Sequence, residues 1–303
     1  MRTRIVSTLA LLACLPAFAD DVASRPGRLP EGIAPIHYDI HVEPDSTALT
    51  LAGRTSIEVQ VARATDRVTV NALDLAIQSA KVDGKPVQSV TTDAAAQTAT
   101  LQLTRPLPTG RHRIEFVYTG KIYQTATGLF AVDYGPEGSR QRMLTTQFEV
   151  ADARRFAPMW DEPTAKATFT LEAVIPAGQS AYSNMPVARS RLVDGKQIVR
   201  FERSPKMSSY LLHLTVGDLE RISRKVAGVD IGVVTRRGAS AKGQMSLDAA
   251  AEILPWYNEY FGTPYPLPKL DMIAVPGASQ FFGAMENWGA IMYFEPALLV
   301  DPS

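Results

Sequence analysis

The stretch Gly283-Ala284-Met285-Glu286-Asn287-Trp288-Gly289 organises the rest of this chain. One apolar segment, residues 270–275, leads into it, and another, residues 290–294, leads away from it. Glycine allows a second backbone to approach closely. An extended segment at this place would offer unpaired N–H and C=O groups to a docking peptide. The stretch therefore predicts a peptide-binding edge between two apolar segments.

The acidic side chain of this stretch suits a positively charged ligand. Glu286 would place its carboxylate at one end of a docked strand. A free α-amine has an ordinary pKa of about 7.7–8.0, so it is mostly charged at neutral pH. The alternative is a glycine-bounded turn with a solvated glutamate, because short motifs also occur by chance.

A second distinctive region lies upstream. It consists of Thr146-Gln147-Phe148-Glu149, then Asp152-Ala153-Arg154-Arg155, then Trp160-Asp161-Glu162-Pro163. With the glycine-bounded stretch, this region resembles the aminopeptidase N-like (gluzincin) family of zinc metallopeptidases, and the resemblance covers nearly all of the chain after its first residues. Because two separate motifs of this family occur in the expected order, we do not attribute the match to chance. The acidic and basic residues around Arg154 are typical of a loop braced by ion pairs.

The resemblance implies a set of substrate-binding residues. Glu286 and Glu149 would hold the free amine of a peptide, and Gln147 would hydrogen-bond its first residue. The implied set is Gln147, Glu149, Gly283, Ala284, Met285, Glu286 and Asn287. Two acids also make physical sense, because removing an ammonium group from water is costly unless paired charge offsets the cost. The side chains of Phe282 and Met285 would form an apolar wall for the first residue.

No residue of this chain is expected to be catalytic or to bind metal. The family's zinc site is H-E-x-x-H on a helix, with both histidines on one helix face. The chain has four histidines, His37, His41, His112 and His213, and none is followed by Glu. We therefore expect the zinc ligands, the general-base glutamate and the family's transition-state tyrosine to lie beyond Ser303. For His37 and His41, four apart on a predicted strand, a solvated sheet face explains the spacing better than a metal pair.

Hydrophobic periodicity predicts a mainly β protein. From about residue 28 to residue 222, apolar and polar residues alternate, as at Tyr38, Ile40 and Val42. The last such series is Tyr210, Leu212, Leu214 and Val216. Short alternating strands separated by turn residues favour an antiparallel β-sandwich. We assign this sandwich to residues 20–225. The family resemblance implies that residues 226–303 are the first, incomplete part of an α+β thermolysin-like catalytic domain.

The second region carries one helical pattern. Ser246 can cap a helix that runs to about Phe261. Its apolar stripe comprises Leu247, Ala250, Leu254, Tyr257 and Phe261. Pro255 lies inside the pattern and predicts a kink or a break.

The first residues indicate export. Arg2 and Arg4 precede an apolar run, and Ala17-Phe18-Ala19 fits a signal-peptidase site, which predicts a signal peptide over residues 1–19 and a periplasmic or secreted product. A lipoprotein site at Cys14 fits less well, because Leu12 is a poor match within such a motif. No later stretch is apolar enough over sufficient length to span a bilayer.

Composition narrows the function further. The chain has 303 residues, with 31 Lys+Arg and 31 Asp+Glu, so charge gives no support to nucleic-acid binding. We expect the N-terminal portion of a zinc-dependent aminopeptidase, acting on peptides with a free N-terminus. The alternative is a non-catalytic peptide- or partner-binding β-sandwich protein without a metal site. The sequence following Ser303 separates the two. The oligomeric state is not indicated.

Overall fold

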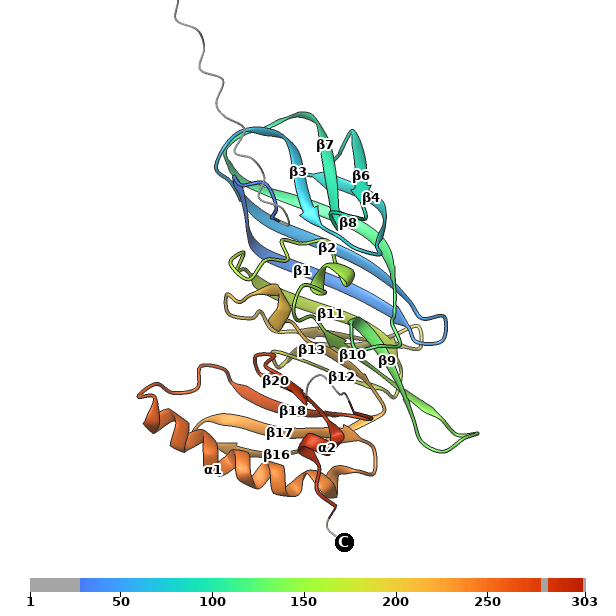
Figure 1. The fold of residues 1–303 in the computed structure, drawn as a ribbon, viewed down its shortest axis with the longest axis vertical. Helices are drawn as coiled ribbons and strands as arrows, with labels where there is room; N and C mark the ends of the chain where they lie inside the picture. Colours follow the sequence, from blue (N-terminus) through green and yellow to red (C-terminus); the bar gives the residue numbers. More distant parts are fainter. Residues whose placement is uncertain (1–27, 279–282, 302–303) are drawn as a thin grey trace, which may run out of the picture.

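The computed structural model describes residues 28–278 and 283–301. Its strands form four sheets, and a long helix lies at one end of the elongated molecule (Figure 1). The predicted signal peptide and Phe282 lie outside the described residues.

The first region is a β-sandwich, as the alternation predicts. An eight-stranded sheet has the order β13 (Val187–Val193), β14 (Lys196–Phe201), β11 (Thr168–Pro176), β1 (Ile33–Asp45), β2 (Thr50–Val61), β8 (Gly110–Lys121), β4 (Ala76–Val82) and β5 (Lys85–Pro86). One face of it shares a core with two smaller sheets. One of these is β3 (Thr65–Asn71), β7 (Thr98–Leu107) and β6 (Ser89–Asp93). The other is β12 (Ser180–Ser183), β15 (Leu214–Gly217), β10 (Gln141–Gln147) and β9 (Gly128–Tyr134).

Burial explains the alternation. Tyr38, Ile40 and Val42 are all fully buried on one side of β1. The pairing differs from the prediction at one place, because β1 runs parallel to β11 within a sheet whose other pairs are antiparallel. Period two reveals which face of a strand is buried, and it carries no information about the direction of its neighbour.

The second region is a mixed five-stranded sheet. Its order is β16 (Leu219–Val226), β17 (Val229–Arg236), β18 (Lys269–Val275), β20 (Ala290–Phe294) and β19 (Ala284–Met285). The first region ends with β15, so the change of sheet comes earlier than the predicted boundary at residue 225. The reason is that β16 pairs with β17 over its whole length. The region also contains α2 (Glu295–Leu298), and the described residues include the 3-10 helices η1 (Ala153–Arg155), η2 (Ser209–Leu211) and η3 (Ser240–Gly243).

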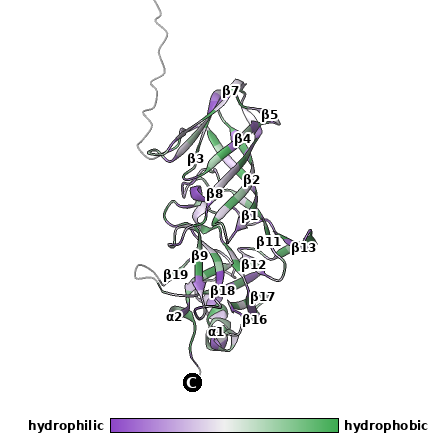
Figure 2. Ribbon diagram, turned by 90° about the vertical axis from the view of Figure 1, so that its right-hand side faces the viewer, coloured by the Kyte–Doolittle hydropathy of each residue, from purple (hydrophilic) through white to green (hydrophobic). Residues whose placement is uncertain are grey.

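The five-stranded sheet is covered on both faces. Its first face packs against the four-stranded sheet through a core that includes Met143, Ile273 and Met285. Its second face packs against α1 (Gln244–Tyr260), which contributes Leu247 and Leu254. In Figure 2, turned by 90°, α1 is seen at the foot of this stack, below the strands. We call the first of these two cores the seam.

The helix α1 differs from its prediction in three respects. It begins after Gly243, and the Ser246 hydroxyl donates to the carbonyl of Leu298 instead of capping the helix. It continues through Pro255, because packing of its buried face outweighs one lost hydrogen bond on an exposed turn. Tyr257 and Phe261 are exposed and contact each other beyond the buried stripe.

Among the described residues, no helix has the length and apolar character needed to cross a membrane.

Candidate functional site

The stretch 283–289 forms an edge strand and a turn. Ala284 and Met285 make up β19, which pairs antiparallel with β20 at Tyr293 and Met292. The carbonyl of Gly283 continues this pairing by accepting a 3.0 Å bond from the N–H of Phe294. Among the described residues, β19 is the last strand of its sheet and pairs on one side only. Docking of a further strand on its other side stays a prediction from the sequence.

Burial alternates from Ala284 to Gly289. Met285, Asn287 and Gly289 are buried, while Ala284, Glu286 and Trp288 are exposed. The Met285 side chain is 3% exposed and packs in the seam, so it does not form the apolar wall that we predicted. The exposed residues therefore line the outer surface, and the buried ones attach the segment to the molecule.

Asn287 attaches the segment to the sandwich. It is 1% exposed, and its Nδ2 donates to the carbonyls of Leu211 and Leu212 at 3.3 and 3.4 Å. Its Oδ1 is buried without a hydrogen-bond partner among the described residues. The structure thus places this predicted substrate-binding side chain against the sandwich backbone, where it fixes the position of its neighbour Glu286.

The end of the stretch is held from both regions. Asn184, in the turn after β12, donates through Nδ2 to the carbonyl of Trp288 at 2.9 Å. The carbonyl of Gly289 accepts from Lys269 Nζ at 2.5 Å and from the N–H of Asp271 at 3.0 Å. Gly289 has φ +71°, and a Cβ at this position would overlap the backbone oxygen of Asn184. Only glycine satisfies both requirements.

A buried ion cluster supports this end of the stretch. Lys269 pairs with Asp271 at 2.9 Å, and Arg221 pairs with the same aspartate at 2.8 Å. Burial lowers the pKa of Lys269, and Asp271 opposes that effect. Asp271 is only 1% exposed, and a buried ion pair is strongly destabilised when one of its partners is removed.

Glu286 projects from the stretch toward the sandwich. Its Oε1 accepts a 2.6 Å hydrogen bond from the hydroxyl of Tyr210, which belongs to η2. This bond raises the pKa of Tyr210 to about 12, and burial and the charge of Glu149 act in the same direction. The structure therefore brings Glu149 and Glu286, distant in sequence, to the surroundings of one tyrosine hydroxyl.

The two carboxylates are not neutralised locally. Both side chains are exposed, and in the described part of the chain neither forms an ion pair with Lys, Arg or His. Two nearby acids without a cation raise the negative potential of the space between them. Such a place favours a small cation, and an ammonium group can also donate hydrogen bonds to both acids.

Gln147 adds an unsatisfied acceptor beside Glu149. It ends β10, is 5% exposed, and its Oε1 is buried with no partner among the described residues. A buried unpaired acceptor costs about 1–3 kcal/mol relative to a paired one. A ligand N–H could remove that cost.

Thr146, next to Gln147 in the sequence, belongs to a buried hydrogen-bond network. His213 is fully buried, with Nε2 2.7 Å from Thr215 Oγ1 and Nδ1 3.3 Å from Thr146 Oγ1. Burial lowers the pKa of His213 to about 3, so it is neutral at physiological pH. No sequence pattern assigns a role to this histidine, and the structure uses it to join β10 to β15.

The charged loop around Arg154 and Asp161 contacts η2. Arg154 binds Asp161 at 3.0 Å, and Asp161 accepts a 2.6 Å bond from the hydroxyl of Ser209. The prediction of a bracing cluster is therefore confirmed for this pair. Tyr210 follows Ser209, although its alternating series predicts a strand. Buried serine hydroxyls satisfied by this loop and by Pro163 produce the 3-10 turn instead.

Sequence reasoning missed Tyr210 and Asn184. Tyr210 looks like an ordinary member of an alternating strand and Asn184 like an ordinary turn residue. Their partners Glu286 and Trp288 lie 76 and 104 positions away. No local pattern reports such pairings.

The described residues do not fit a zinc ion. No group of three or more His, Cys, Asp or Glu side chains within residues 28–278 and 283–301 is arranged to hold a metal. His37 and His41 each have separate partners, Thr168 Oγ1 at 2.8 Å and Glu172 Oε1 at 2.9 Å.

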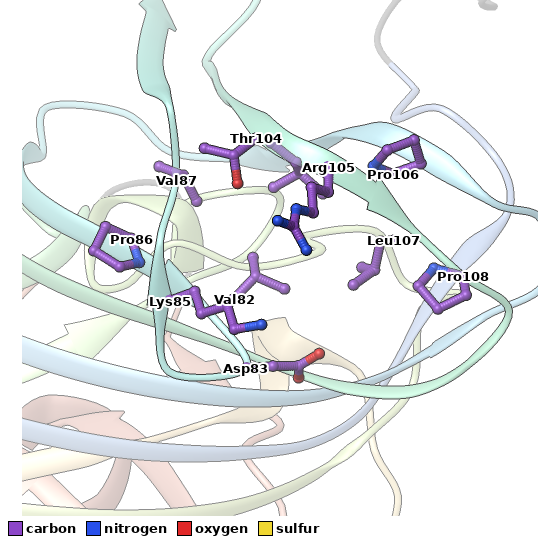
Figure 3. Close-up of a pocket in the computed structure, with 11 residues that line it drawn as sticks. Val82, Asp83, Lys85, Pro86, Val87, Thr104, Arg105, Pro106, Leu107 and Pro108 are labelled. Carbon is purple, nitrogen blue, oxygen red and sulfur yellow. The ribbon is translucent and has the colours of Figure 1, made fainter.

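A cavity of about 450 Å³ lies away from this site, between β4, β5 and β7 at the other end of the molecule. Figure 3 shows Arg105, Lys85 and Asp83 around it. Asp83 already accepts a 2.9 Å bond from the N–H of Arg113 and lies 2.8 Å from His112 Nδ1. We assign no role to this cavity.

Two domain models and several known proteins match this chain. Residues 34–211 match the Peptidase M1 N-terminal domain, and residues 245–303 match the Peptidase family M1 domain. The chain is 41% identical to "Aminopeptidase N" of Acetobacter pasteurianus over 99% of this chain and 86% of that protein. It is 37% identical to "Aminopeptidase 2" of Candida albicans over 90% of this chain and 30% of that protein.

A third relative is "Puromycin-sensitive aminopeptidase" of Caenorhabditis elegans, 38% identical over 91% of this chain and 30% of that protein. The chain thus spans 30% of the length of each of these last two relatives. With the first domain model matching more than half of its residues, the chain belongs to peptidase family M1.

Proposed function

We propose that this chain is the N-terminal part of a zinc-dependent aminopeptidase and forms the half of its active site that recognises the substrate amine. The observation that supports this most strongly is the pair of acids Glu149 and Glu286 around Tyr210, without a cation of their own in the described part of the chain. Beside them, β19 is the last strand of its sheet among the described residues, and its outer side would align the peptide backbone.

In this proposal each residue has a separate task. Glu149 and Glu286 bind the ammonium group and so measure one residue from the N-terminus. Gln147 Oε1 accepts an N–H of the first residue. The backbone of Gly283, Ala284 and Met285 extends the sheet onto the substrate. The zinc ion would supply the hydrolytic chemistry, held by residues outside the described part of the chain.

The test is substrate discrimination in the full-length enzyme. Glu286→Gln and Glu149→Gln should each lower kcat/KM for an aminoacyl anilide by about ten- to a hundredfold, because a hydrogen bond to a charged group contributes about 1.5–3 kcal/mol. Glu252→Gln, an exposed acid on α1, is the matched control and should leave kcat/KM unchanged. Equal preference for free and N-acetylated substrates in wild type and both variants would contradict the proposal.

Two further outcomes separate it from a non-catalytic binding protein. The 303-residue chain alone should not cleave aminoacyl anilides, and chelator-sensitive turnover by it would contradict the predicted division of the active site. An H-E-x-x-H sequence within the next few tens of codons after Ser303 would support the enzyme, and its absence would favour a peptide-binding protein.

We also propose a periplasmic or secreted location. The N-terminus of the exported protein should be Asp20, and protein sequencing checks this. A lipid-modified Cys14 would contradict the proposed cleavage site.

A further inference from the structure

The residue that holds Glu286 is itself held in place. Tyr210 lies in η2, where Ser209 donates to Asp161 at 2.6 Å and Ser208 donates to the carbonyl of Pro163 at 2.8 Å. Its ring packs at the edge of the seam. The hydroxyl is therefore held in a defined position, whereas the side chain of its partner Glu286 is exposed.

In the hydrogen bond between Tyr210 and Glu286, the tyrosine hydroxyl is always the donor. With its pKa raised to about 12, Tyr210 keeps its proton throughout the neutral range and can only donate to the Glu286 carboxylate. Oε1 accepts this bond at 2.6 Å, and among the described residues Oε2 has no hydrogen-bond partner and can face a ligand. A free glutamate side chain loses up to about 1.5–2 kcal/mol of rotamer freedom when it is ordered. The bond from the Tyr210 hydroxyl offsets part of that loss before a ligand binds.

We propose that Tyr210 is a positioning residue for amine recognition, which orients Glu286 from the opposite domain so that its second carboxylate oxygen faces the substrate ammonium. This inference rests on the proposed function. It makes the pocket composite, because the orienting hydroxyl comes from the sandwich and the binding carboxylate comes from the five-stranded sheet.

A neighbouring tyrosine offers a matched control. Tyr134 on β9 also packs against the seam, and its hydroxyl is buried without a partner in the described chain. Tyr210→Phe and Tyr134→Phe therefore each remove one hydroxyl from a ring that packs against the seam. Only the first removes a bond to Glu286.

The experiment measures peptide binding to the metal-free full-length protein by titration calorimetry. The probe is an unmodified dipeptide, with its N-acetylated form as the comparison. Tyr210→Phe should weaken binding of the free-amine dipeptide by about three- to tenfold, because one hydrogen bond to a charged group is lost at an exposed site. Tyr134→Phe should change it less than about twofold, and neither substitution should alter binding of the acetylated form.

Kinetics of the zinc-loaded enzyme give a second readout. Tyr210→Phe should raise KM for an aminoacyl anilide by a similar factor and leave kcat within about twofold, as expected when an interaction is lost equally from the bound substrate and the transition state. A fall in kcat alone would overturn the assignment.

A double-mutant cycle separates positioning from general packing. In a Glu286→Gln background, Tyr210→Phe should have little further effect on free-amine binding. Equal losses in both backgrounds would mean that the tyrosine acts through the fold. Should Tyr210→Phe fold poorly, Glu286→Asp tests the same bond, because it keeps the charge and withdraws the carboxylate from the hydroxyl.

The outcomes distinguish this inference from the proposed function. If Glu286→Gln leaves binding of the free-amine dipeptide unchanged, the amine-recognition function itself is wrong. If Glu286→Gln weakens binding and Tyr210→Phe does not, only the role of Tyr210 is wrong.

Discussion

Replacing Gly289 by alanine should be among the most destabilising changes in the candidate site. The residue has φ +71°, a conformation that costs an L side chain about 1–2 kcal/mol. Its new Cβ would also overlap the backbone oxygen of Asn184 and lie 3.2 Å from Leu267 Cδ1. A backbone oxygen cannot rotate away as a side chain can, so the segment itself must move.

That movement would cost identifiable hydrogen bonds. The bond from Asn184 to the carbonyl of Trp288 is 2.9 Å long, and the bond from the N–H of Asp271 to the carbonyl of Gly289 is 3.0 Å long. Each contributes about 0.5–1.5 kcal/mol, and more if a buried group is left unpaired. With the backbone strain, the unfolding free energy should fall by about 2–5 kcal/mol.

A second glycine isolates the clash. Gly195, in the turn between β13 and β14, has φ +74°, and a Cβ added to it would meet no atom within 4 Å. Gly195→Ala carries the same backbone strain and the same loss of unfolded-state entropy, so it should cost only about 1 kcal/mol. Urea unfolding followed by circular dichroism measures both. Equal losses in the two variants would refute the close-approach argument.

Three other changes test the supports of the site. Burial lowers the pKa of His213 to about 3. Below about pH 6.5 the unfolded chain therefore binds a proton at this histidine that the folded chain does not bind. As the pH is lowered below about 6.5, the free energy of unfolding should decrease by up to about 1.4 kcal/mol per pH unit. His213→Gln should remove this component, measured as the difference between the two urea-derived pH profiles, and parallel profiles would contradict it. Lys269→Met should cost about 3–5 kcal/mol because it leaves buried Asp271 with one cation fewer. Lys242→Met, which removes an exposed ion pair, should cost no more than about 1 kcal/mol, and similar losses in both would count against the buried cluster.

The alternation of apolar residues predicted the sandwich because burial in a sheet has a period of two. It failed at Tyr210 and Leu212, where the same spacing occurs in and beside a 3-10 turn. What decides between the two there is the hydroxyl of Ser209, whose acceptor Asp161 is 48 positions away. Sequence periodicity indicates which residues are buried. It cannot indicate a turn that depends on a hydrogen bond to one distant carboxylate.

The helix shows the same limit. The buried face with Leu247 and Leu254 was predicted correctly, because i, i+7 spacing follows from helix geometry. The first residue was predicted incorrectly, since Ser246 has the right chemistry for a cap but finds the carbonyl of Leu298. Capping competes with tertiary hydrogen bonds, and only the structure shows which partner is closer.

For the candidate site, family resemblance predicted the acids and left their support unknown. Glu149 alone would be an exposed acid at the end of a strand. The role that we propose for it depends on Tyr210 and Glu286, and the latter follows β19 in a different sheet from β10. Distances between domains follow from packing in the seam, which no short motif contains.

The alternating burial of residues 284–289 gives a physical reason for the composition of this stretch. Buried Met285 joins the seam, Asn287 binds the sandwich backbone, and Gly289 allows the approach of Asn184. Each buried residue lies beside an exposed one, so Glu286 is fixed on both sides by contacts to different parts of the molecule. A polar residue at position 285 or a larger one at position 289 would shift Glu286 away from Tyr210. The acid that we propose to bind the substrate is therefore placed by its buried neighbours in the chain as well as by the hydroxyl of Tyr210.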